Sequence, residues 1–225
     1  DSINADSSVD ESLLVEVNIL VEAPTALMGS FAKKHLELPA EVLVGVMKKH
    51  QRYFPVYNKQ GDLMPYFITV RNGNEENLDI VAHGNEEVIQ ARFADAAFFM
   101  REDSSKTLEE MLPKLESLTF QPALGSMLAK SKRILAITKD ISKDLGLSET
   151  ERRNAERAAY LAKADLVTNM VVEMTSLQGT IGKFYALRDG EPEQVAHAIE
   201  EHYMPRQAGG NSPSSKTGLA VGIAD

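Results

Sequence analysis

One short segment carries side chains that could bind a phosphate backbone. It is Lys48-Lys49-His50-Gln51-Arg52-Tyr53-Phe54, which combines three cations with two aromatic rings. Cations neutralise phosphates, and aromatic rings stack on unpaired bases. The alternative is structural: Tyr53 and Phe54 belong to a hydrophobic core, and the lysines stabilise the C-terminus of a helix. The segment therefore predicts either a nucleic-acid contact or an ordinary helix end.

A second basic region lies farther along the chain. The net charge is −9, which disfavours a nucleic-acid partner if the charge is averaged over the whole chain. Met127 to Ala164, however, carries nine bases and five acids, whereas the first 41 residues carry eight acids and two bases. Lys130 and Arg133 are three residues apart, so one helix face can present both, with Lys132 beside them. A solvated helix face explains the same pattern.

Residues for independent catalysis do not form recognised motifs. The five histidines include no HExxH pair, and the absence of cysteine excludes disulfides, thiolate catalysis and cysteine-bound zinc. The sequence contains no Walker A loop, no G-x-G-x-x-G loop and no G-x-S-x-G elbow. We therefore expect no catalytic residue and no metal site in this chain.

The elements that would position the first basic segment are a helix and a β-hairpin. Leu38-Pro39 opens a helix whose apolar residues lie on one face. Aromatic and β-branched runs at 53–57 and 66–70 flank a loop that contains Gly61, which predicts a hairpin. Residues 15–21 alternate and then become continuously apolar, which predicts a further strand.

After Asn74 the pattern is helical. Apolar residues recur at a period near 3.6 over 85–100 and 128–145, and the second run stops at Gly146. Ser148-Glu149-Thr150-Glu151 forms a capping box, from which we expect one helix to run toward residue 172. The pattern predicts an α+β fold: a mixed domain with the hairpin at residues 1–108, then an all-α domain at 109–225. Because the last apolar helix stops abruptly, we expect the natural chain to continue.

Short segments spread along the chain resemble one known family. In chain order they are Leu38–Leu43, Met47–Phe54, Pro65–Ile68, Arg71–Asn74, Gly84–Glu86, Ala91–Ala96, Leu124–Ser126, Lys163–Thr168, Leu177–Gly179, His202–Arg206 and Ile223–Asp225. Together they resemble the glycyl-tRNA synthetase β subunit from about Asp10 onward. The resemblance implies a tRNA-binding, non-catalytic β portion of a glycine–tRNA ligase with no cofactor of its own. Its partners would be tRNA(Gly) and an α part, fused or separate, which uses ATP and Mg²⁺ to activate glycine.

The resemblance also implies two domain types. The first domain would be similar to the editing module of phenylalanyl-tRNA synthetase β subunits. The C-terminal domain would be similar to a helical HD domain, a fold otherwise used by metal-dependent phosphohydrolases. Ala164-Asp165 matches the position of the name-giving His-Asp pair, and Asp225 matches the family's late aspartate. Because alanine replaces the histidine, the two carboxylates make a poor metal site, and we expect this scaffold to contact tRNA without hydrolysing phosphates.

The candidate tRNA-binding residues are Lys48, Lys49, His50, Arg52, Arg92, Lys130, Lys132 and Arg133. We expect the acidic N-terminal segment to face away from the RNA, because its charge would repel phosphate. The alternatives are an HD-type phosphohydrolase, an editing deacylase, or a helical adaptor without RNA contact. No apolar run approaches the ~20 residues needed to cross a bilayer, so no membrane is expected. A bacterial cytoplasm is the expected location, with an organelle as the alternative.

Overall fold

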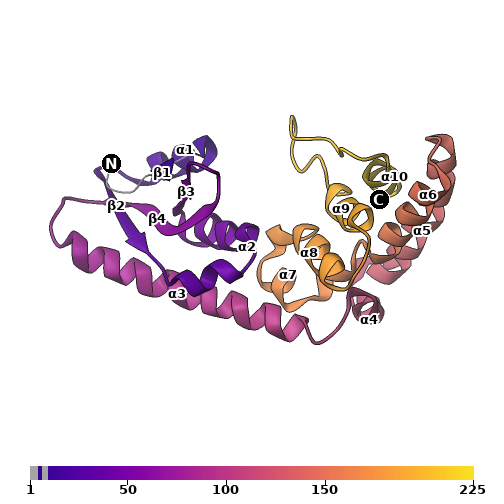
Figure 1. The fold of residues 1–225 in the computed structure, drawn as a ribbon, viewed down its shortest axis with the longest axis horizontal. Helices are drawn as coiled ribbons and strands as arrows, with labels where there is room; N and C mark the ends of the chain where they lie inside the picture. Colours follow the sequence, from indigo (N-terminus) through magenta and orange to yellow (C-terminus); the bar gives the residue numbers. More distant parts are fainter. Residues whose placement is uncertain (1–4, 7–9) are drawn as a thin grey trace. The chain divides into compact units, whose positions relative to one another are not determined.

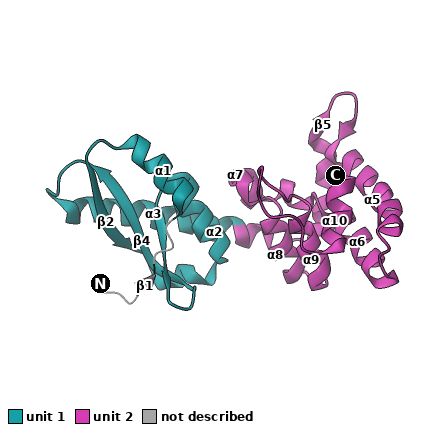
Figure 2. Cartoon of the chain, turned by 90° about the horizontal axis from the view of Figure 1, so that it is seen from above, with its two compact units in different colours: residues 1–99 teal, residues 100–225 magenta. Residues whose placement is uncertain are grey.

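The computed structural model describes residues 5–6 and 10–225. The chain divides into two compact units, Asp1–Phe99 and Met100–Asp225, which are coloured separately in Figure 2. This division lies before the boundary expected between residues 108 and 109. Helices and an antiparallel sheet occur together in the chain, which confirms the predicted α+β class. No helix among the described residues is long and apolar enough to cross a membrane.

Unit 1 is built on a four-stranded antiparallel sheet with the strand order β1-β3-β4-β2 (Figure 1). The strands are β1 (Ala5–Asp6), β2 (Pro24–Ser30), β3 (Phe54–Asn58) and β4 (Leu63–Asn72). The helices are α1 (Glu11–Leu20), the 3₁₀ helix η1 (Lys33–Glu37), α2 (Ala40–Gly45), the π-helix η2 (Val46–Gln51) and most of α3 (Leu78–Asp103). Strands β3 and β4 pair as the predicted hairpin, and α2 begins after Pro39 as predicted.

Aromatic contacts join α3 to the sheet of unit 1. Phe93 on α3 is fully buried, and its ring centroid lies 4.9 Å from that of Phe31. Tyr53 stacks on Phe67 of β4 with 4.5 Å between centroids, and its hydroxyl donates to Asn85 on α3 over 2.8 Å. The predicted helix over residues 85–100 is confirmed, although α3 starts earlier, at Leu78.

The strand expected at residues 15–21 is wrong, because this segment belongs to helix α1. Asp10 caps the helix by accepting the Leu13 amide over 3.1 Å. Leu13 and Val17, four residues apart, are the buried positions, while Ile19 is 78% exposed. Four-residue spacing places two apolar side chains on one helix face, so burial follows the helical period rather than the alternation of a strand.

Unit 2 is mainly helical. Its helices are α4 (Leu108–Met111), η3 (Leu112–Ser117), α5 (Met127–Asp144), α6 (Glu149–Leu161), η4 (Ala164–Val167), α7 (Asn169–Glu173), η5 (Thr175–Leu177), α8 (Thr180–Arg188), α9 (Glu193–Glu201) and α10 (Lys216–Ala224). It also contains a two-stranded ladder of β5 (Thr119–Gln121) and β6 (Gly125–Ser126), so the all-α prediction was incomplete. Gly125 makes this turn with a φ of +83°, a value that glycine adopts without steric cost.

The single helix expected from Glu149 toward residue 172 is interrupted. The capping box of Ser148 and Glu151 is confirmed, but α6 ends at Leu161 and the chain continues through η4 into the separate helix α7. Helix α7 has a cap of its own: the Thr168 hydroxyl accepts the Val171 amide over 3.2 Å. Asp103 accepts the first two amides of α7, those of Asn169 and Met170, so a tertiary contact completes this helix start.

Candidate functional site

The first basic segment lies where η2 ends and the hairpin begins. Two of its cations are ion-paired to α1 and its cap: Lys48 Nζ lies 2.7 Å from Asp10, and Arg52 Nε lies 2.7 Å from Glu16. The hydrogen bond from Lys48 holds the pKa of the Asp10 carboxyl well below its usual range. Two acids of the N-terminal segment, Asp10 and Glu16, therefore pair with two of the predicted phosphate-binding residues.

The other members of this segment divide into exposed and buried side chains. Lys49 and His50 are exposed. Tyr53 is only 4% exposed, and burial raises the pKa of its hydroxyl to about 12. Its ring already stacks on Phe67, so the structural interpretation holds for this aromatic residue, and it cannot stack on an RNA base.

The remaining predicted RNA contacts lie on α3 and α5. Arg92 is exposed on α3. On α5, Lys130 Nζ lies 2.8 Å from Asp225 and 4.5 Å from the centroid of the Phe120 ring. Arg133 donates to the backbone carbonyl of Leu124 over 2.9 Å and is exposed, as is Lys132. The three neighbouring α5 cations therefore have different surroundings, although they are close in sequence.

A buried cationic cluster surrounds the predicted His-Asp position. Ala164 is fully buried, and the preceding residue, Lys163, is 3% exposed. The Lys163 ammonium lies 2.7 Å from Asp225, 2.9 Å from His202 Nε2 and 4.1 Å from the centroid of the Tyr203 ring. Burial lowers the pKa of the Lys163 ammonium, and the Asp225 carboxylate opposes this shift. Asp225 thus receives two ammonium groups, one from Lys163 and one from Lys130.

His202 acts in this cluster as a neutral acceptor. Its Nδ1 lies 2.7 Å from the carbonyl oxygen of Ile199, which can only accept, so Nδ1 carries the proton. Nε2 then accepts a hydrogen bond from the Lys163 ammonium. Burial lowers the pKa of His202, and the neighbouring Lys163 charge lowers it further. The imidazole therefore stays neutral, and its one acceptor atom, Nε2, is occupied by the Lys163 ammonium.

Asp165 is separately engaged at the N-terminus of α8. Its Oδ2 accepts the Gly179 amide over 2.5 Å, so the carboxylate caps this helix. The side chain is buried, and burial raises its pKa to about 6, against the opposing effects of the Gly179 amide and Lys163. A Cβ added to Gly182 would lie 3.0 Å from Oδ2 and 2.7 Å from Ile199, which explains a glycine at this position.

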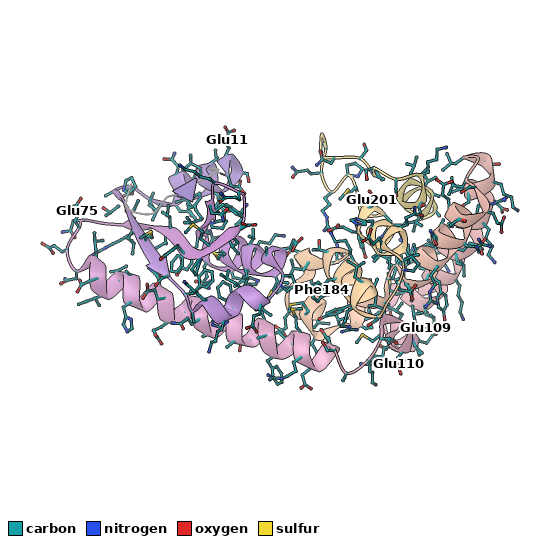
Figure 3. The ribbon with its side chains drawn as sticks, viewed as in Figure 1. Glu11, Glu75, Glu109, Glu110, Phe184 and Glu201 are labelled. Atoms are coloured by element: carbon teal, nitrogen blue, oxygen red, sulfur yellow. The ribbon has the colours of Figure 1, made fainter. Side chains whose placement is uncertain are left out.

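Glu201 orients the helix that carries Asp225. It is buried, and it accepts the backbone amides of Ser214 and Ser215 over 3.1 and 3.3 Å, together with both hydroxyls. Ser215 in turn caps α10 by accepting the Gly218 amide over 2.9 Å. Figure 3 labels Glu201 on α9. This chain of contacts fixes the start of α10, at whose other end Asp225 meets the lysines.

The cluster is better suited to holding an ammonium than a metal ion. Within residues 5–6 and 10–225, no group of three or more His, Cys, Asp or Glu side chains is placed to hold a metal. Sequence reasoning identified Asp165 and Asp225 but missed Lys163 and His202. Both missed residues lie inside segments that carried the family resemblance, at 163–168 and 202–206, and this was the signal that could have found them.

Comparisons with known proteins agree with the resemblance. The family model described as "Glycyl-tRNA synthetase beta subunit" matches residues 2–225. The "Glycine--tRNA ligase beta subunit" of Bacillus subtilis is 51% identical over 96% of this chain, and that of Moorella thermoacetica is 50% identical over 96%. The protein of the same name from Trichodesmium erythraeum is 49% identical over the full chain. The chain spans 31–32% of the length of these relatives. Since the model match covers almost every residue, the chain belongs to the glycyl-tRNA synthetase beta subunit family.

Proposed function

We propose that this chain is a tRNA-binding, non-catalytic part of a bacterial, cytoplasmic glycine–tRNA ligase. The observation that carries the proposal is the family match over residues 2–225. The relatives are named as beta subunits, which supports an α part as the partner and tRNA(Gly) as the RNA. Glycine activation, with its ATP and Mg²⁺, would then take place on the α part.

The RNA contacts are best assigned to the candidate residues that are exposed and form none of the ion pairs described above. These are Lys49, His50, Arg92, Lys132 and Arg133. Lys48, Arg52 and Lys130 can reach a phosphate only by exchanging their carboxylate partners, so they are weaker candidates. Each phosphate contact releases a counterion from RNA, and its loss lowers the slope of log affinity against log salt by ~0.7–0.9.

We further propose that unit 2 keeps an HD-like scaffold without hydrolase chemistry. Both carboxyl groups of the degenerate site have partners within the protein: Asp225 pairs with two ammonium groups, and Asp165 Oδ2 accepts a backbone amide, while its buried Oδ1 has no hydrogen-bond partner among the described residues. After dialysis, the wild-type ligase subunit and its Asp165→Ala variant should have the same metal content. The α part, treated with a chelator and measured alone, is the blank. Stoichiometric metal that depends on Asp165 would revive the phosphohydrolase alternative.

The RNA-binding proposal is tested by charge reversal in the intact ligase. The double substitution Lys132→Glu and Arg133→Glu should raise the KM for tRNA(Gly) at least several-fold, because it removes two phosphate contacts and adds two repulsive charges. Glycine-dependent pyrophosphate exchange, which reports activation alone, should not change. Lys59→Glu, an exposed reversal in the hairpin turn, is the matched control. Unchanged tRNA affinity and salt dependence in the double variant would make α5 an ordinary solvated face.

The non-catalytic part of the proposal has its own test. The purified 225-residue chain should support no glycine-dependent pyrophosphate exchange, because its sequence contains no recognised ATP-binding loop. Addition of the purified α part supplies the positive control. Exchange by the chain alone, after removal of host ligase, would contradict this assignment.

A further inference from the structure

An apolar pocket opens within unit 2 between η3, α5 and α6. Its volume is about 290 Å³, and its walls are formed mainly by Leu112, Pro113, Leu128, Leu135 and the ring of Tyr160. The polar residues that line it are Glu109, Ser131 and Lys132. The Ser131 hydroxyl already donates to the Met127 carbonyl over 3.1 Å. Glu109 and Lys132 are therefore the groups that offer a ligand charge and hydrogen bonds.

A polar network fixes one rim of this pocket. Glu109, labelled on α4 in Figure 3, lies 2.7 Å from Arg157 Nη2. Arg157, which also forms a bidentate pair with Glu191, lowers the pKa of Glu109, and the Tyr160 hydroxyl contributes in the same direction. The Arg157 guanidinium lies 5.7 Å from the Tyr160 ring centroid. Glu109 is therefore an ionised acceptor held beside a partly exposed aromatic ring.

We propose that this pocket binds one unstacked nucleobase of the tRNA, with Lys132 on the adjoining phosphate; the inference rests on the proposed function. A nucleobase has two apolar faces, which suit the leucine walls and the Tyr160 ring. Its edge carries N–H groups, which can donate hydrogen bonds to the Glu109 carboxylate. The linked phosphate is an anion, which matches the exposed Lys132 ammonium.

A protein side chain fits the same pocket less completely. An apolar side chain from another subunit would fill the walls, but it would offer no partner to the Lys132 ammonium and no further donor to Glu109, which Arg157 already pairs. Covering charged groups without pairing them costs free energy. A nucleotide matches the walls and both charges at once, so the observations favour RNA as the occupant. The carboxylate also predicts a preference for bases that present an amino or imino N–H at their edge.

The test compares pocket variants of the intact ligase in binding a tRNA(Gly) transcript over a range of salt concentrations. Leu135→Trp fills the pocket, and Tyr160→Leu removes the stacking ring. Each should weaken binding about tenfold, since stacking of one base on an aromatic ring contributes about 1–3 kcal/mol, and neither should change the salt slope. Lys132→Ala should instead lower the slope by ~0.7–0.9. Ile137→Trp, at an exposed α5 position outside the pocket, is the matched control and should bind as wild type.

Two further measurements separate folding effects and other occupants. Tyr160→Phe keeps the ring and should bind tRNA nearly as wild type, which limits the effect of Tyr160→Leu to loss of the ring. Leu135→Trp leaves Tyr160 in place, so it tests the pocket even if Tyr160→Leu unfolds unit 2. Chemical probing should show one tRNA base that is protected by wild-type ligase and reactive with Leu135→Trp. Loss of that protection together with weaker binding supports the proposal.

Three results would overturn the proposal. If Lys132→Ala weakens binding but both pocket variants bind as wild type, the nucleobase pocket is wrong and the proposed function stands. If the pocket variants release the α part at unchanged tRNA affinity, the pocket docks protein instead. If neither Lys132→Ala nor the pocket variants change tRNA binding, both the pocket and the assignment of RNA contacts to α5 fail.

Discussion

Replacement of Lys163 by methionine tests whether the buried ammonium holds unit 2 together. Methionine keeps much of the side-chain volume but removes the charge that lies 2.7 Å from Asp225 and 2.9 Å from His202. Two unit charges at 2.7 Å interact by roughly 6 kcal/mol at an effective dielectric constant of 20, and desolvation of the buried ions offsets part of this.

The expected loss follows from what remains after the substitution. Removal of one partner from a buried ion pair costs about 3–5 kcal/mol. Lys130 still neutralises Asp225 at 2.8 Å, so we expect the lower end, about 3 kcal/mol. Double substitution of Lys163→Met with Asp225→Asn should recover part of the loss, because it removes a carboxylate that has lost one of its two ammonium partners.

Hydrogen exchange in α10 is the appropriate assay, because this helix carries Asp225 and reports opening of unit 2 by itself. The opening free energy of its amides should fall by about 3 kcal/mol in Lys163→Met. Lys143→Met, at an exposed site on α5, should leave it unchanged and serves as the control. A loss below about 1 kcal/mol, or an equal loss in the control, would show that the cluster is solvated and that its geometry does not stabilise the fold.

Three more substitutions test the surroundings of this cluster. Burial raises the pKa of the Asp165 carboxyl from 3.8 in the unfolded chain to about 6 in the folded state. Between these two pH values the folded state keeps the proton that the unfolded state loses. The free energy of unfolding should therefore fall by about 3 kcal/mol as pH rises from 3.8 to 6. Urea titrations across this window should show that Asp165→Asn removes this decline; a pH-independent difference from wild type would refute it. Gly182→Ala places a Cβ on α8 2.7 Å from Ile199 on α9. It should lower the melting temperature, with a loss of about 1–3 kcal/mol in the free energy of unfolding. An unchanged melting temperature would mean that α8 and α9 can move apart without cost. Asp103→Ala leaves the amides of Asn169 and Met170 without their acceptor, so exchange in α7 should quicken by the equivalent of about 1–3 kcal/mol, and unchanged protection there would contradict this cap.

Local features were predictable wherever a short stretch of sequence contains the whole cause. The hairpin follows from two β-forming runs around a glycine-bearing loop, and the α6 cap needs only Ser148 and Glu151. The family could also be identified, since its segments occur in order along the chain. Two failures show the limit. Residues 15–21 are apolar enough for either element, and packing against a distant core decided for a helix. Helix α6 ends at Leu161, and contacts from Thr168 and Asp103 start a separate helix after η4.

The charged sites show the difference most clearly, because a charge is local while its neutralisation is not. The sequence by itself determined which residues are cationic and where they cluster along the chain. Only the tertiary structure decided that Lys48 faces Asp10, 38 residues away, and that Lys163 meets Asp225, 62 residues away. Electrostatic interactions depend on distance in space and on exposure to water, and the order of residues specifies neither until the helices pack. The fold therefore decided which cations are paired within the protein and which stay exposed.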